Sequence, residues 1–193
     1  MQNIRDSITL VETMLGSNML ELFKILNKMV EDGAIKAYAL CGAMAAFEYI
    51  EPAATRDVDV TAKMITSGLI LDYQPIINFL NNNNIPVKWD EEGLYIAGYP
   101  VQFIPDDKPL DTEALANAAV IDNEGVTVPI WRIEYLMAKC LEVFRPKDQL
   151  RLVQFLEVGY NREEFCNLIQ RFELTERWQA FCSRFDQDDF CSA

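Results

Sequence analysis

The sequence predicts an α+β protein, in which a mixed sheet is flanked by helices and followed by a helical C-terminal end. Strand-like runs alternate with amphipathic helical segments through the first two thirds of the chain, and only helical periodicity follows them. Half of the 193 residues are hydrophobic, so the chain can bury a substantial core. We therefore predict an α/β core with N-terminal helices over residues 1–130 and a helical region packed on it over residues 131–193.

For the first part of the core, the sequence predicts two helices, a strand, a third helix and a second strand. Apolar residues recur at helical spacing between Asn18 and Asp32, and Gly33 suits the end of that helix. A shorter helix is predicted among residues 8–14. The elements that follow are a buried strand over residues 37–41, a turn at Gly42–Ala43, a helix over residues 44–50, a loop broken by Pro52, and a strand from Asp57.

The rest of the chain predicts short strands and then helices. Pro75 is tolerated in the first turn of one helix, and Gly98 joins two antiparallel strands. The predicted helices cover residues 72–81, 111–119, 133–144, 149–157, 162–172 and 175–185. The predicted extended segments cover residues 86–90, 94–97 and 99–104, with a hairpin of residues 120–122 and 126–129 around Asn123-Glu124-Gly125.

Composition excludes several classes of site. The sequence has no histidine, which removes Ser-His-Asp and Cys-His hydrolases, HExxH metalloproteases and histidine-based zinc sites. Any chemistry must therefore use carboxylates, lysine, arginine, backbone amides and a bound ion. The formal net charge of −13 repels polyanions, so extended nucleic-acid binding is disfavoured, although a local basic patch could engage a tRNA end.

The five cysteines, Cys41, Cys140, Cys166, Cys182 and Cys191, form no CxxC pair, and the chain begins without a basic-then-apolar signal segment. The longest apolar run, residues 37–47, is too short to span a membrane. A soluble protein of the reducing cytoplasm, with no membrane association, is the expectation.

Asp57 and Asp59 are the candidate metal ligands. Side chains alternate along a strand, so both acids point to one face while Val58 and Val60 point into the core. Two close carboxylates repel each other, and such a pair holds a cation, shares a proton or stays well solvated. Gly42 stands before a helix start, whose free N–H groups attract phosphate, or it serves only a turn that needs a small residue. Together these features suggest metal-dependent nucleotide chemistry.

Five ordered motifs resemble those of the nucleotidyltransferase superfamily, over roughly residues 35–156. They are Gly42-Ala43, Thr55-Arg56-Asp57-Val58-Asp59-Val60, Tyr99-Pro100-Val101-Gln102-Phe103-Ile104-Pro105, residues 131–139 and Arg145-Pro146-Lys147-Asp148. The most similar branch is the small bacterial proteins that include toxins of abortive-infection and type IV toxin–antitoxin systems. The resemblance implies a polymerase-β-like fold and a nucleoside triphosphate laid across Gly42 and the strand of the two aspartates.

The resemblance also implies residue roles. Asp57 and Asp59 would ligate Mg²⁺, or Mn²⁺ in its place, while an acceptor hydroxyl attacks the nucleotide. Arg56, Lys139 and Lys147 would hold phosphates, and Asp148 would orient Lys147 or cap a helix. The sequence departs from the family at Ala43, where a second glycine or a serine is common, and at Gln102, where a third carboxylate is expected.

Three functions stay open: nucleotidyl transfer, binding of nucleotide or a partner without turnover, and a structural or interaction role. The amide of Gln102 bears on the first two. An amide cannot accept a proton at neutral pH, so the protein is slow, uses Asp106 or Asp107 instead, or binds nucleotide without turnover. The third function is an interaction role, such as a toxin–antitoxin component whose acidic surface binds a basic protein partner. Simpler roles also remain for single residues: a surface lysine for Lys139, loop charge and an N-cap for Lys147 and Asp148, and a wet strand face for Gln102.

Overall fold

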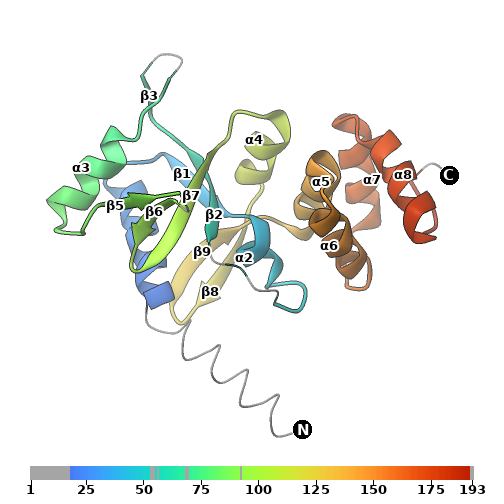
Figure 1. Cartoon of the computed structure of the whole chain (residues 1–193), viewed down its shortest axis with the longest axis horizontal. Coiled ribbons are helices and arrows are strands. Elements are labelled where there is room, and N and C mark those ends of the chain that lie inside the picture. The colour runs from blue at the N-terminus through green and yellow to red at the C-terminus, as the bar shows by residue number, and fades with distance from the viewer. Residues whose placement is uncertain (1–17, 53–54, 56, 68–69, 92, 192–193) are drawn as a thin grey trace, which may run out of the picture.

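A seven-stranded mixed sheet forms the centre of the protein (Figure 1). The computed structural model describes residues 18–52, 55, 57–67, 70–91 and 93–191. The sheet has the order β5-β6-β7-β2-β1-β9-β8. Its strands are β1 (Ala37–Leu40), β2 (Val58–Lys63), β5 (Lys88–Asp90), β6 (Gly93–Ile96), β7 (Tyr99–Pro105), β8 (Ala119–Asn123) and β9 (Val126–Ile130). A separate small hairpin pairs β3 (Thr66–Ser67) with β4 (Ile70–Leu71).

Both parallel and antiparallel pairs occur at the middle of the sheet. β2 pairs antiparallel with β1 and parallel with β7, and β1 pairs parallel with β9. The outer pairs β5–β6, β6–β7 and β8–β9 are all antiparallel. The predicted α+β class, a mixed sheet flanked by helices, is therefore confirmed.

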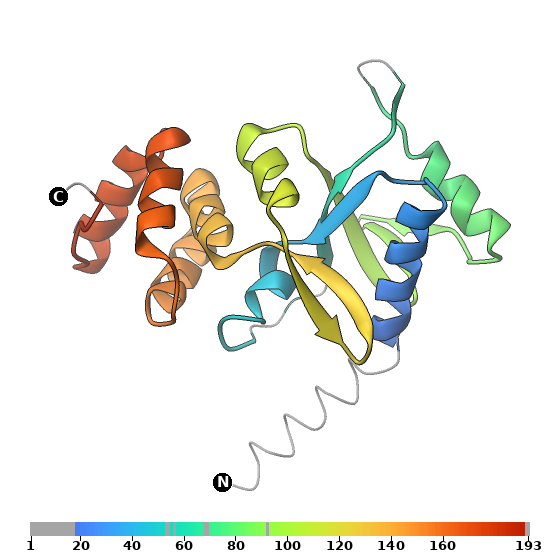
Figure 2. The ribbon, with the colours of Figure 1, turned by 180° about the vertical axis from the view of Figure 1, so that it is seen from behind.

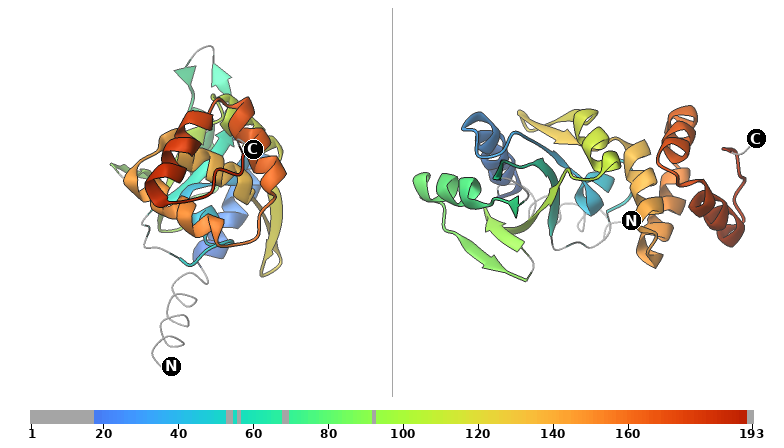
Figure 3. Two further views of the ribbon diagram at one scale, coloured as in Figure 1. Left: turned by 90° about the vertical axis from the view of Figure 1, so that its right-hand side faces the viewer. Right: turned by 90° about the horizontal axis from the view of Figure 1, so that it is seen from above.

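Helices surround the sheet and then continue beyond it. The N-terminal helix, residues 18–31, and α3 (Gln74–Asn82) lie at the end of the molecule opposite the C-terminal helices (Figures 1 and 2). α2 (Gly42–Ala46) and α4 (Pro109–Ala116) both contact α5. The C-terminal helices are α5 (Ile133–Val143), α6 (Pro146–Leu156), α7 (Arg162–Arg171) and α8 (Thr175–Phe185). Figure 3 shows these four gathered on one side of the sheet, as predicted for the end of the chain.

Most predicted elements are present, with shifts at their ends. α4 and α6 each begin at a proline, Pro109 and Pro146, two and three residues earlier than predicted, because proline is well suited to the first position of a helix. The β8–β9 hairpin turns through Glu124 and Gly125, both with positive φ, as a two-residue hairpin requires. The β3–β4 hairpin was not predicted. The predicted helix among residues 8–14 lies outside the described residues.

None of the helices in the described segments combines the length and apolar character needed to cross a membrane.

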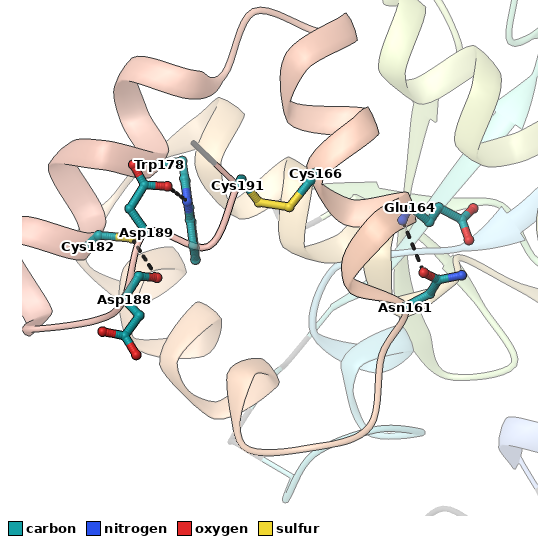
Figure 4. Close-up of a disulfide and its surroundings, with 8 residues drawn as sticks. All are labelled: Asn161, Glu164, Cys166, Trp178, Cys182, Asp188, Asp189 and Cys191. Carbon is teal, nitrogen blue, oxygen red and sulfur yellow. Dashed lines mark hydrogen bonds between the residues drawn. A yellow bond between two sulfur atoms is a disulfide. The ribbon is translucent and has the colours of Figure 1, made fainter. Parts of the chain in front are cut away.

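A disulfide joins Cys166 of α7 to Cys191 after α8 (Figure 4). Sequence reasoning expected reduced thiols and a reducing compartment, because it found no CxxC pair. The pairing arises from the tertiary fold, since a sequence separation of 25 carries no local signature. Disulfides persist mainly in oxidising compartments, so this bond weighs against that expectation. The cytoplasmic location stays a prediction.

We expect reduction of this disulfide to lower the free energy of unfolding by about 3 kcal/mol, because the bond restricts the unfolded chain. Urea unfolding with and without dithiothreitol measures the change. In the Cys166→Ser/Cys191→Ser protein, dithiothreitol should have no effect. Mass spectrometry that finds both thiols free in the oxidised wild-type protein would contradict the assignment.

Candidate active site

Asp59 of β2 and Asp57, the residue directly before this strand, lie on the face opposite to Val58 and Val60, as predicted. Val58 and Val60 are buried at 1% and 0% exposure, and the two acids are half-buried. Alternation along the strand therefore brings both carboxylates to the side of the sheet that carries α2 and α5. Asp59 senses the charge of Asp57, which adds to the rise that burial causes in the pKa of Asp59.

Gly42 permits the close approach of α2 to Asp59. Its φ of +62° lies in the left-handed region, and a Cβ built there would be 2.0 Å from Asp59 Oδ2. The backbone N–H of Cys41 donates to the Asp59 carbonyl at 3.0 Å, which fixes the end of β1 beside the strand of acids. A glycine is thus required at position 42 for two reasons: the backbone has a positive φ, and the Asp59 carboxylate occupies the space that a Cβ would need. Because α2 has only five residues, we assign little to its dipole.

We expect Gly42→Ala to displace the Asp59 carboxylate and to weaken divalent-ion binding. Gly33→Ala is the matched control, because Gly33 has φ +74° with nothing within 4 Å of a built Cβ. Both changes should cost about 1–2 kcal/mol of backbone strain, and Gly42→Ala more, because only it adds a collision. Urea unfolding and Mn²⁺ titration measure the two effects. Equal losses of stability and unchanged ion binding in both variants would contradict this role.

Two neutral donors orient Asp57. Thr55 Oγ1 donates to Asp57 Oδ1 and Gln102 Nε2 donates to Asp57 Oδ2, each at 2.9 Å. Gln102 reaches Asp57 because β7 is parallel to β2 and pairs Gln102 with Asp59 in register. The structure therefore places Gln102 beside the two acids. Its side-chain amide presents an N–H group to the site and donates it to Asp57.

Of the two acids, Asp59 is the one whose ionised form is shown to be disfavoured. Burial raises its pKa to about 6, and the neighbouring Asp57 carboxylate adds to the rise. The charges of Lys147, Arg151 and Arg145 act in the opposite direction. The carboxylate form is therefore held at a cost in free energy, which a bound cation would offset.

A cavity of about 840 Å³ opens over these residues, between the sheet and helices α5 and α6. Of the predicted site residues, all those described line it: Gly42, Ala43, Asp57, Asp59, Gln102, Lys139, Lys147 and Asp148. Arg56 lies outside the described residues. The wall also has an apolar part, formed by Ile104, Trp131, Leu136, Val143, Leu150 and Val153. The volume and the mixed polar and apolar lining are typical of a small-molecule site.

Lys139 is not a free cation. Its ammonium donates to both Asp111 oxygens at 2.7 and 2.9 Å and to Glu142 at 2.6 Å. Because two carboxylates already neutralise it, its predicted contact with phosphate would require these ion pairs to rearrange. In this structure Lys139 ties α5 to α4.

Asp148 caps α6, but from the third helical position. It accepts from the backbone N–H of Arg145 at 3.1 Å and from the Arg145 guanidinium at 2.7 and 3.2 Å. The alternative that Asp148 is itself the N-cap is therefore wrong, because α6 begins at Pro146 and not at Gln149. The predicted capping function is present. No hydrogen bond or ion pair between Asp148 and Lys147 accompanies it in the described residues.

The structure adds residues that sequence reasoning missed. Thr55, Asp111 and Arg151 also line the cavity, whereas Asp106 and Asp107 do not. Asp111 comes from the first turn of α4 and is 2% exposed. Arg151 lies one turn after Lys147 in α6. The i,i+4 spacing of Lys147 and Arg151 could have indicated that Arg151 shares the site. The predicted helix begins at residue 149, so it leaves Lys147 out and hides this spacing.

The pair of acids suits a hard divalent cation. Mg²⁺ prefers oxygen ligands and is commonly bound by one or two carboxylates together with water and substrate phosphates. Within the described part of the chain, no third acid or thiol joins the pair in a metal-binding group. Asp57 and Asp59 can therefore supply two ligands and leave the remaining positions to a phosphorylated ligand and water.

No family model matches the sequence, and no curated protein matches it. Among solved structures, it is similar to an antigenic nucleotidyltransferase-like protein from Paracoccidioides brasiliensis, at 14% identity and a TM-score of 0.49, over 83% of this chain and 93% of that one. It is also similar to the antibiotic-resistance factor ANT(2'')-Ia, at 12% identity and a TM-score of 0.40, over 87% of this chain and 93% of that one.

Proposed function

We propose that the protein binds a nucleoside triphosphate with Mg²⁺ in the cavity over β2 and transfers the nucleotide to a hydroxyl acceptor. The observation that carries this proposal is the Asp57–Asp59 pair, half-buried on one strand face inside a cavity of about 840 Å³. Burial raises the pKa of Asp59 to about 6, so the apo site favours a positive ligand. The assignment to the toxin-type branch of nucleotidyltransferases is part of the same proposal.

The residues of the chain have separate tasks in this proposal. Asp57 and Asp59 would hold the divalent ion, which supplies charge neutralisation at the reacting phosphate when bound. Thr55 and Gln102 hold Asp57 in one orientation through their hydrogen bonds at 2.9 Å. Gly42 gives the Asp59 carboxylate its space against α2. Helices α5 and α6 form one wall of the cavity and supply most of its apolar lining.

A second function is favoured by Gln102. Its amide faces Asp57 at 2.9 Å and cannot take the proton of an acceptor hydroxyl. Losing a positioned base costs about 10²–10⁴-fold in rate. The alternative is therefore a protein that binds nucleotide and Mg²⁺ without turnover, for example as one component of a toxin–antitoxin pair with a protein partner.

The test separates binding from transfer. Calorimetry measures ATP binding with Mg²⁺ and with EDTA, and α-labelled NTPs incubated with Mg²⁺ and cell extract report transfer. Asp57→Ala and Asp59→Ala are the controls. Label transfer that depends on both aspartates supports the transferase. Mg²⁺-dependent binding without transfer supports the second function, and the absence of both rejects the nucleotide site.

A further inference from the structure

We propose that Lys147 and Arg151 form a clamp for the terminal phosphates of the nucleotide, so that the site selects nucleoside triphosphates over monophosphates. The proposal rests on the proposed nucleotide-binding function and adds Arg151 as a specificity-determining residue. Both cations belong to α6, four residues apart, and both line the cavity over β2. Residues at this spacing lie on one face of a helix, so the two charges point into the same space.

Neither cation has a partner among the described residues. No hydrogen bond or ion pair joins Lys147 or Arg151 to another described side chain, whereas Arg145 pairs with Asp148 and Lys139 pairs with Asp111. The chain carries 30 acidic and 17 basic residues, so acidic partners are plentiful. Two like charges at i,i+4 also repel each other. Together, these observations indicate that the pair is kept free for an anionic ligand.

The charge of the clamp reaches Asp59. Burial raises the pKa of Asp59 and of the cavity-lining Cys140; Lys147 and then Arg151 act against this rise at Asp59, and Arg151 acts against it at Cys140. The clamp and the acids therefore lie across one cavity from each other. A ligand between them would meet positive charge on the α6 side.

Charge balance makes the clamp the source of attraction for phosphate. The two aspartates and one divalent ion sum to zero charge. Lys147 and Arg151 then supply the surplus positive charge on the α6 side. Each further phosphate adds negative charge to a nucleotide, so removal of a cation should weaken binding of a triphosphate more than that of a monophosphate. Arg151 adds a planar fork whose fixed geometry matches two oxygens of one phosphate, whereas the Lys147 ammonium has no such fixed geometry.

The experiment is calorimetry with Mg²⁺ and three ligands: ATP, AMP and inorganic tripolyphosphate, which carries no base. The variants are Arg151→Ala, Lys147→Ala and Arg151→Lys. Lys24→Ala is the matched control, because Lys24 is an exposed residue of the N-terminal helix and does not line the cavity. Urea unfolding checks that each variant is folded.

We expect Arg151→Ala and Lys147→Ala each to weaken ATP and tripolyphosphate by about tenfold to a hundredfold, with a change for AMP of less than about threefold. Arg151→Lys should lie between wild type and Arg151→Ala, and Lys24→Ala should match wild type. Wild-type affinity for ATP in Arg151→Ala, or equal losses for ATP and AMP, overturns the clamp alone. A wild-type protein that binds neither ATP nor tripolyphosphate overturns the nucleotide site as well.

Discussion

Asp59→Asn is expected to stabilise the metal-free protein while removing nucleotide transfer. Burial and the nearby Asp57 raise the pKa of Asp59 from 3.8 to about 6. Well below the unfolded pKa of 3.8, at about pH 3 and lower, the carboxyl is protonated in both the folded and unfolded states, so it contributes no difference. As the pH rises from 4 to 6, the unfolded state loses its proton first, and the free energy of unfolding falls. Above pH 6 the full cost is about 3 kcal/mol.

Asparagine removes this charge and keeps the shape. In EDTA at pH 7, we therefore expect the free energy of unfolding of Asp59→Asn to exceed that of wild type by up to about 3 kcal/mol, and the difference to shrink as the pH falls and to vanish at about pH 3. Comparing the two proteins at each pH cancels the other titrating groups. Urea unfolding between about pH 3 and 8 measures the difference.

The same variant should lose transfer by about 10³-fold or more, because a divalent ion supplies several kcal/mol of charge stabilisation at the reacting phosphate. Mg²⁺ should stabilise wild type and leave Asp59→Asn unchanged. This combination of higher stability and lost activity is typical of a functional site. An Asp59→Asn protein that is less stable than wild type in EDTA, or equally stabilised by Mg²⁺, would show that Asp59 is a structural acid.

Gln102→Asp is expected to raise transfer by about 10²–10⁴-fold, since it supplies a carboxylate that can accept the acceptor's proton. The register pairs residue 102 with Asp59, and the Gln102 amide already contacts Asp57 at 2.9 Å. A third carboxylate would therefore join the other two. Without divalent ions the three acids repel, so the melting temperature should fall in EDTA and recover with Mg²⁺.

Gln102→Ala is the control for this gain. It removes the hydrogen bond that orients Asp57 without adding a carboxylate, so kcat should be at or below that of wild type. Single-turnover assays with α-labelled ATP separate chemistry from binding. If Gln102→Asp is no faster than Gln102→Ala, the missing carboxylate does not limit the reaction. The binding-only function then becomes the better account.

The parts of the fold set by local pattern were predictable from sequence. Alternation along β2 placed Val58 and Val60 in the core and Asp57 and Asp59 on the other face, and the Asn123-Glu124-Gly125 turn defined a hairpin. Helix starts were less accurate at Pro109 and Pro146, because the predicted helices begin at residues 111 and 149, after prolines that occupy the first helical position.

Features that depend on tertiary contact could not be predicted. The ion pairs of Lys139 come from Asp111, 28 residues earlier in the chain, and only the packing of α4 on α5 brings them together. The Cys166–Cys191 bond likewise needs α7 and the segment after α8 to meet. Gln102 lies beside Asp57, where the resemblance expects a third carboxylate, because β7 pairs in parallel with β2.

A crystal structure with Mn²⁺ and a non-hydrolysable ATP analogue tests the central claim most directly, because anomalous scattering locates the ion without reference to activity. The account predicts an anomalous peak coordinated by Asp57, Asp59 and phosphate oxygens, with Gln102 retained on Asp57. The peak should be absent from Asp59→Asn crystals treated in the same way. A peak elsewhere, or an analogue bound away from β2 with both aspartates unligated, would contradict it.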